Sequence, residues 1–112
     1  MSEPTRVADI ILQQLGGNKF TVMTGSKNYL AEENTLRMHL AKNKSGANRL
    51  RITLNWNDLY SLEFYRHIPG KLNKNTLEYT NDAVEAVAEF DDVYCDQLQS
   101  IFTQVTGLYT HL

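Results

Sequence analysis

The sequence predicts a single α+β domain spanning residues 1–112. It comprises an N-terminal helix, an antiparallel meander of three to five strands, and a C-terminal helix packed on one face of the sheet. Apolar residues recur at helical spacing near both ends of the chain, whereas the middle alternates apolar and polar residues in short runs. A chain of 112 residues, 42% of them apolar, can bury one core without disulfides or metals. Both helices need an apolar surface, and the inner face of the meander is the only large one available.

The N-terminal helix is predicted to end at residue 15. Ser2 suits the N-cap, and Glu3 and Pro4 suit the first turn. The apolar stripe consists of Val7, Ile10, Ile11 and Leu15. The pair Gly16-Gly17 ends the helix, because glycine accepts the left-handed conformation that closes one.

The region that follows, residues 19–34, is predicted to hold one strand and a loop. Lys19 to Thr24 is interpreted as a strand with Phe20 and Val22 on one face. Residues 25–28 (GSKN) have turn chemistry, and residues 29–34 are expected to form a loop.

The meander is predicted over residues 35–42, 49–56 and 59–67. Leu50, Ile52, Leu54 and Trp56 alternate with polar residues in the second run, and Leu36, Met38 and Leu40 do so in the first. Residues 43–48 form a polar, Gly-containing connection, and residues 57–58 a tight turn, which is typical of hairpins. Pro69-Gly70 ends the third strand, since proline lacks the donor that a ladder needs.

The C-terminal third is less regular. Residues 71–80 form a polar excursion that suits a short extra hairpin, and residues 83–90 fit both a helix and a strand, with the helix favoured. The last helix is predicted to be capped by Asp91 or Asp92 and to end at Gly107. Its apolar stripe consists of Tyr94, Leu98, Ile101, Phe102 and Val105.

The charges are distributed unevenly along the chain. Residues 1–74 contain all eleven Lys and Arg and six acids, a balance of +5, whereas residues 75–112 contain seven acids and no Lys or Arg, a balance of −7. Together they give the net charge of −2. A positive surface attracts anionic partners that an acidic surface repels, so the two portions favour different partners.

The hairpin over residues 35–56 is the strongest candidate for a binding surface. Residues 35–57 contain five bases and no acid. If the apolar set faces the core, the alternation places the arginines and His39 on the outer face. The candidate binding residues are Arg37, His39, Lys42, Lys44, Arg49, Arg51 and Tyr65.

Such a basic face with an aromatic side chain can bind phosphates and stack a base, so nucleic acid or an acidic protein is a candidate partner. The competing interpretation is a solvated face, in which basic residues discourage aggregation and Glu63 pairs with an arginine across the strands. The sequence pI of about 5.9 also lies below that typical of dedicated nucleic-acid binders.

No enzymatic motif is present in the sequence. Gly16-Gly17 follows a predicted helix, whereas a phosphate-binding loop precedes one. His39, His67 and His111 have no cysteine or carboxylate at metal-ligand spacing, so we expect neither a metal nor a cofactor. Cys95 is surrounded in sequence by acids, which disfavour a reactive thiolate, and the acidic residues around it lack the spacing of a calcium loop.

The compartment is inferred from cysteine usage and hydropathy. Cys95 is the only cysteine, so no intrachain disulfide is possible, and the sequence opens without a secretory signal. No apolar run approaches the roughly 20 residues needed to span a bilayer. We therefore expect a cytoplasmic protein with no membrane contact, while the oligomeric state is left open.

Several segments resemble a group of small proteins from bacteriophages, prophages and other bacterial mobile elements. They are residues 16–20 (GGNKF), residues 23–28 (MTGSKN), residues 51–54 (RITL), Tyr60 with Glu63-Phe64, and residues 93–94 and 106–109 (VY and TGLY). The likeness covers most of the chain, with residues 69–80 as an insertion relative to shorter members. It implies a phage or mobile-element origin and supplies no reaction, cofactor or catalytic residue.

These observations favour a non-enzymatic accessory protein that acts by binding. One alternative is a nucleic-acid binder that uses the outer face of the basic hairpin. Another is an inhibitor of a host protein that presents the acidic segment 82–96 as a mimic of nucleic acid. An enzyme is disfavoured, because no nucleophile and base are paired in the sequence.

Overall fold

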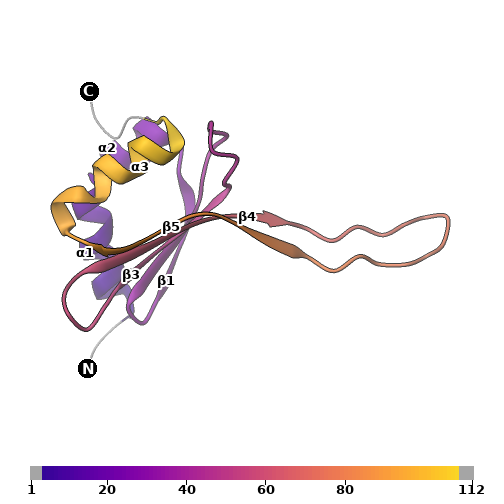
Figure 1. Cartoon of the computed structure of the whole chain (residues 1–112), viewed down its shortest axis with the longest axis horizontal. Helices are drawn as coiled ribbons and strands as arrows, with labels where there is room; N and C mark the ends of the chain where they lie inside the picture. The colour runs from indigo at the N-terminus through magenta and orange to yellow at the C-terminus, as the bar shows by residue number, and fades with distance from the viewer. Residues whose placement is uncertain (1–3, 109–112) are drawn as a thin grey trace.

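The computed structural model describes residues 4–108, so Ser2, Glu3 and His111 lie outside the described residues. Three α-helices cover one face of a five-stranded antiparallel sheet whose order is β1-β2-β3-β4-β5 (Figure 1). The predicted α+β meander with a helix before and after it is confirmed. The elements are α1 (Pro4–Leu15), α2 (Asn18–Thr24), β1 (Lys27–Glu32), β2 (Thr35–His39), β3 (Arg49–Leu54), β4 (Tyr60–Ile68), β5 (Ala83–Val93), a 3-10 turn η1 (Cys95–Gln97) and α3 (Leu98–Thr106).

Helix α1 ends where the sequence predicted, at Leu15 before the two glycines. Ala8, Ile11 and Leu15 are buried, whereas Ile10 is exposed, so the predicted stripe is shifted by part of a turn. Gln99 of α3 donates through Nε2 to the free carbonyl of Leu15 at 2.7 Å. This bond ties the end of the first helix to the last one.

The predicted strand over residues 19–24 is wrong, because this segment forms α2. Phe20 and Thr24 are both buried, because residues four apart lie on the same face of a helix. Val22, which a strand would have buried with Phe20, is 81% exposed. Gly25 closes the helix in the left-handed region at φ 70°, and its N–H donates to the carbonyl of Thr21 at 3.0 Å.

The predicted loop over residues 29–34 is also wrong, because residues 27–32 form the edge strand β1. It pairs antiparallel with β2, and Lys27 faces His39 across the ladder. The irregular step in the register between Lys27 and Leu30 coincides with the positive φ of Asn28. Such an irregularity interrupts the alternation of apolar and polar residues by which a strand is predicted from sequence.

The central strands confirm the predicted meander. Leu36, Ile52 and Leu62 are direct cross-strand partners, and so are Met38, Leu50 and Phe64, and all six are buried. The prediction that Trp56 belongs to the apolar face of the second strand is wrong, because this residue lies in the β3–β4 turn and is 95% exposed. The Asn55 N–H donates a hydrogen bond to the carbonyl of Leu59 at 2.8 Å, which closes this turn.

The segment over residues 83–90 belongs to β5, so the favoured helix is wrong and the strand alternative is correct. Eight of the eleven residues of this edge strand are exposed, so burial imposes little alternation of apolar and polar residues on its sequence. Asp91 and Asp92 belong to β5 and do not cap the last helix. The carboxamide oxygen of Gln97 instead accepts the Tyr94 N–H at 3.0 Å, and Tyr94 itself is exposed.

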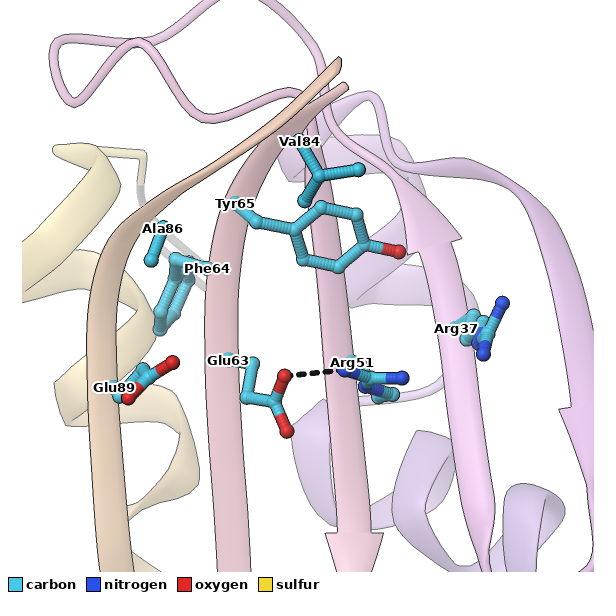
Figure 2. Close-up of a pocket in the computed structure, with 8 residues that line it drawn as sticks. All are labelled: Arg37, Arg51, Glu63, Phe64, Tyr65, Val84, Ala86 and Glu89. Atoms are coloured by element: carbon cyan, nitrogen blue, oxygen red, sulfur yellow. Dashed lines mark hydrogen bonds and ion pairs between the residues drawn. The ribbon is translucent and has the colours of Figure 1, made fainter. Parts of the chain in front are cut away.

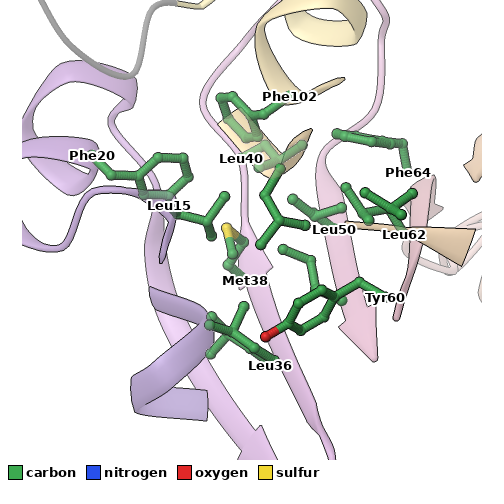
Figure 3. Close-up of a cluster of buried hydrophobic side chains, with 14 of the residues drawn as sticks. Leu15, Phe20, Leu36, Met38, Leu40, Leu50, Tyr60, Leu62, Phe64 and Phe102 are labelled. Atoms are coloured by element: carbon green, nitrogen blue, oxygen red, sulfur yellow. The ribbon is translucent and has the colours of Figure 1, made fainter. Parts of the chain in front are cut away.

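The core lies between the inner face of the sheet and the three helices (Figure 3). The ring of Phe102 in α3 packs edge-on against Phe20 at 4.9 Å and lies 6.3 Å from Phe64 of β4. Tyr60 donates its hydroxyl to Gln14 Oε1 at 2.6 Å, which joins β4 to α1. None of the helices among the described residues covers the opposite face of the sheet (Figure 1).

Strands β4 and β5 continue into an arm formed by residues 69–82, which projects from the body (Figure 1). Leu72 and Tyr79 pair across it, which fits the predicted extra hairpin. No described helix is long and apolar enough to cross a membrane.

Candidate functional site

The outer face of the sheet carries the arginines that the alternation predicted there. Figure 2 looks onto this face, with the helices behind the strands. Arg37, Arg51 and Glu63 alternate along their strands with buried inner residues and are partly exposed. The register extends this row to Glu89, so it runs Arg37, Arg51, Glu63, Glu89 across four strands.

The charges of this mixed row largely compensate one another. Arg51 donates a hydrogen bond through a terminal guanidinium nitrogen to Glu63, which raises the pKa of Arg51. Arg37 Nε lies 3.0 Å from Glu32 Oε1 in an ion pair. The predicted cross-strand pairing of Glu63 with an arginine is therefore present. The free charge available to a ligand from this row is small.

A hollow of about 270 Å³ opens above the mixed row (Figure 2). Its lining residues are Arg37, Arg51, Glu63, Phe64, Tyr65, Val84, Ala86 and Glu89. The Arg51 guanidinium carbon lies 5.9 Å from the centre of the Tyr65 ring, within the range of a cation–π contact. The hollow thus combines an aromatic face with hydrogen-bonding groups of both signs.

The neighbouring row on the same face is basic and uncompensated. Lys27 pairs with His39, His39 with Arg49, and Arg49 with Tyr65, on four adjacent strands. Among the side chains that the structure describes, those of residues 7–108, ion pairs are formed only by Arg37, Arg51 and His67, so neither Lys27 nor Arg49 has an acidic partner in this range. We name Lys27, His39 and Arg49 the basic row.

His39 is the neutral member of the basic row. Partial burial, followed by the charges of Arg49, Lys27 and His67, lowers its pKa below the ordinary 6.5. Its Nδ1 accepts a hydrogen bond from the Asn28 carboxamide nitrogen at 3.0 Å. A ring nitrogen can accept only when it carries no proton, so this bond requires the neutral form of His39. At neutral pH His39 is therefore a polar group between two cations.

Sequence reasoning missed Lys27, because β1 was interpreted as turn and loop. The alternation that remains in β1 is the partial burial of Tyr29 and Ala31 on either side of the exposed Leu30. With only two such positions, the signal for a strand was short. The positive charge of Lys27 is brought to the site by its pairing with β2 alone.

Lys42 and Lys44 do not belong to the outer face. Both lie in the β2–β3 connection, although the sequence placed Lys42 in the preceding strand, which ends at His39. The backbone N–H of Lys44 donates to the carbonyl of Thr106 at 3.3 Å. The Lys44 side chain lies beside Gly107, at the carboxyl end of α3, where a cation is favoured by the helix dipole. The connection thus folds toward the helices and carries its lysines away from the arginines.

The other candidate groups are placed as follows. His67 Nε2 lies 3.0 Å from Asp82 Oδ2 at the base of the arm, and Cys95 is an exposed thiol in η1. No group of three His, Cys, Asp or Glu suited to a metal ion occurs among residues 4–108. The acidic residues of segment 82–96 lie along β5, where Glu85, Glu89, Asp91 and Asp92 are exposed.

Comparison of the chain with protein-family models, with curated proteins and with solved structures gives no match.

Proposed function

We propose that this chain is a non-enzymatic accessory protein of a phage or mobile element that binds nucleic acid through the outer face of its sheet. The origin rests on the resemblance of its sequence segments. The binding function rests on one observation, the basic row that runs uncompensated over three strands and ends at Tyr65.

Neighbouring strands lie about 5 Å apart, so Lys27 and Arg49, which are two strands apart, lie about 10 Å from each other. Their long side chains can reach two phosphates of one backbone from these positions. Lys27 and Arg49 supply the two positive charges, and the neutral His39 between them supplies a hydrogen-bonding group. These contacts bind the backbone independently of sequence.

Tyr65 supplies the contact that distinguishes a single strand from a duplex. Its ring lies over the sheet beside the hollow, where an unpaired base can stack (Figure 2). Bases in a duplex are already stacked and present no face to such a ring. We therefore expect single-stranded nucleic acid to bind more tightly than duplex.

The test is fluorescence anisotropy with labelled single-stranded and duplex oligonucleotides over a salt series. Lys27→Glu with Arg49→Glu is expected to abolish binding. Phosphate contacts make log K fall with log salt by about 0.7 per contact for single strands, so the wild type should show a slope of about −1.4 or steeper.

The matched control is Lys19→Glu with Lys44→Glu, which changes the net charge equally but alters α2 and the end of α3. It is expected to retain most of the affinity. Equal losses in the two double variants would show that only total charge matters. That result, or a wild type that binds no oligonucleotide at low salt, contradicts the proposal.

A further inference from the structure

The hollow on the outer face lies where β5 departs from regular pairing with β4. Between the pair Phe64–Ala88 and the pair Tyr65–Ala86, β5 contains one extra residue. Such a bulge bends a strand locally, and bulges are common beside functional sites. Because the side chain of Ala86 is small, it leaves space next to the Tyr65 ring, and this space is part of the hollow (Figure 2).

Three charged side chains lie in a line along the hollow, one on each of three neighbouring strands. Arg51 of β3 faces Glu63 of β4, and Glu63 faces Glu89 of β5. Taken in this order they present a hydrogen-bond donor followed by two acceptors, because a guanidinium only donates and a carboxylate only accepts. All three line the hollow together with Tyr65 (Figure 2). We name Arg51, Glu63 and Glu89 the charged trio.

The two carboxylates of the charged trio retain the capacity to accept further hydrogen bonds. Glu63 accepts the bond from Arg51 through Oε2, and its Oε1 points to no cation in an ion pair. Glu89 takes part in none of the ion pairs among the side chains of residues 7–108. Like charges directly opposite each other on neighbouring strands are destabilising. A ligand that places two N–H donors over this pair of carboxylates relieves their repulsion.

We propose that the hollow binds an unpaired guanine base, an inference that rests on the proposed binding of single-stranded nucleic acid. The Watson–Crick edge of guanine carries a carbonyl oxygen followed by a ring N–H and an exocyclic amino group, which is one acceptor and then two donors. The charged trio is complementary to this order, and unpaired bases are recognised through such edges. Adenine, cytosine and thymine each place an acceptor against at least one of the two carboxylates, whichever way the base is turned.

The basic row and the hollow divide the nucleotide between them. Tyr65 faces Arg49 at the end of the basic row and also lines the hollow, so it connects the two. The backbone phosphates lie over the cations of the basic row, and the base turns over the Tyr65 ring into the hollow. The carboxylates repel phosphates, which keeps the backbone out of the hollow.

The test is fluorescence anisotropy with short labelled thymidine strands that carry one guanine, inosine, adenine or cytosine nucleotide at the centre. The guanine strand is expected to bind about tenfold more tightly than the adenine and cytosine strands, the discrimination typical of a bidentate contact with a base edge. Inosine lacks only the exocyclic amino group of guanosine. It should therefore lose the part of the preference that the second carboxylate supplies.

Two matched variants locate the preference in the hollow. Glu89→Ala is expected to abolish the preference for guanine over inosine and to leave the affinity for the all-thymidine strand no weaker. Glu85→Ala removes the same charge from another exposed residue of β5 that does not line the hollow, and it should keep the preference. Thermal unfolding of both variants should match the wild type, because neither residue belongs to the core.

The outcomes separate this proposal from the binding function on which it rests. Equal affinity for all the strands would overturn the guanine site alone, whereas a chain that binds none of them contradicts both proposals. A guanine preference that survives Glu89→Ala, or that falls equally in Glu85→Ala, also overturns the guanine site.

Free guanosine monophosphate is a second source of the same base. It lacks the neighbouring phosphates that contact the basic row, so it is expected to displace the guanine strand only at concentrations well above that of the strand. Displacement at equal concentrations would assign the hollow to a free nucleotide and overturn its assignment to single strands.

Discussion

At the scale of single residues, the base of the arm is held by one carboxylate. Asp82 Oδ1 accepts the Gly70 N–H at 2.6 Å, and Oδ2 lies 3.0 Å from His67 Nε2. The bond from Gly70 and then that from His67 lower the pKa of Asp82 below the ordinary 3.8. A carboxyl whose pKa is lowered by folding stabilises the folded state above its ordinary pKa, and this contribution is lost as the pH falls through the lowered value.

We expect an NMR titration of the Asp82 carboxyl carbon to give a pKa below 3.8 in the wild type. His67→Asn should raise this value part of the way, because the bond from Gly70 remains. Titration of Asp82 at its ordinary pKa in the wild type would show that the carboxylate does not hold the arm in solution.

At the scale of elements, α2 offers a direct test of helix against strand. Val22 is almost fully exposed on this helix, and valine has a lower helix propensity than alanine. Val22→Ala should therefore increase the free energy of unfolding by about 0.5 kcal/mol. Phe20→Ala should reduce it by about 3–5 kcal/mol, because it removes the buried ring packed on Phe102.

Chemical denaturation of both variants measures these two changes. In the strand that the sequence predicted, Val22 and Phe20 would share the buried face, and both substitutions would be destabilising. A destabilised Val22→Ala variant would thus return the segment to that prediction.

The elements also show which parts of the fold are predictable from the sequence. The rows Leu36–Ile52–Leu62 and Met38–Leu50–Phe64 were predictable because one face of three strands is buried and the other is not. Segment 19–24 has only six residues, which are too few to separate a hydrophobic period of two from one of 3.6. Its helical conformation is stabilised by the Gly25 C-cap and by the packing of Phe20 on Phe102, which comes from the far end of the chain. Most residues of the edge strand β5 are exposed, so its sequence does not show the alternation of apolar and polar residues that predicts a strand.

The same reasoning applies to the candidate site. Arg37, His39, Arg49, Arg51 and Tyr65 were placed on one face by alternation alone. Lys27 joins them, and Lys42 and Lys44 leave them, through pairing and loop packing that no local pattern encodes.

At the scale of the whole molecule, the proposed binding face and the arm use different parts of the sheet. The basic row lies on β1, β2 and β3, whereas the arm extends from β4 and β5.

We accordingly expect the Leu72→Asp, Tyr79→Asp variant to keep the affinity of the wild type for both short and long single strands. Anisotropy titrations with a short and a long oligonucleotide of the same composition measure both affinities. A proportional loss for both lengths would indicate that the arm itself contacts the nucleic acid.

The exposed Trp56 gives the protein a built-in optical probe. It is the sole tryptophan of the chain and stands in the turn before β4, whereas the arm follows the other end of that strand. Its indole ring meets bulk water, so its fluorescence should be red-shifted and readily quenched by acrylamide. Any ligand that covers the β3–β4 turn should shift this emission to the blue and shield it from the quencher.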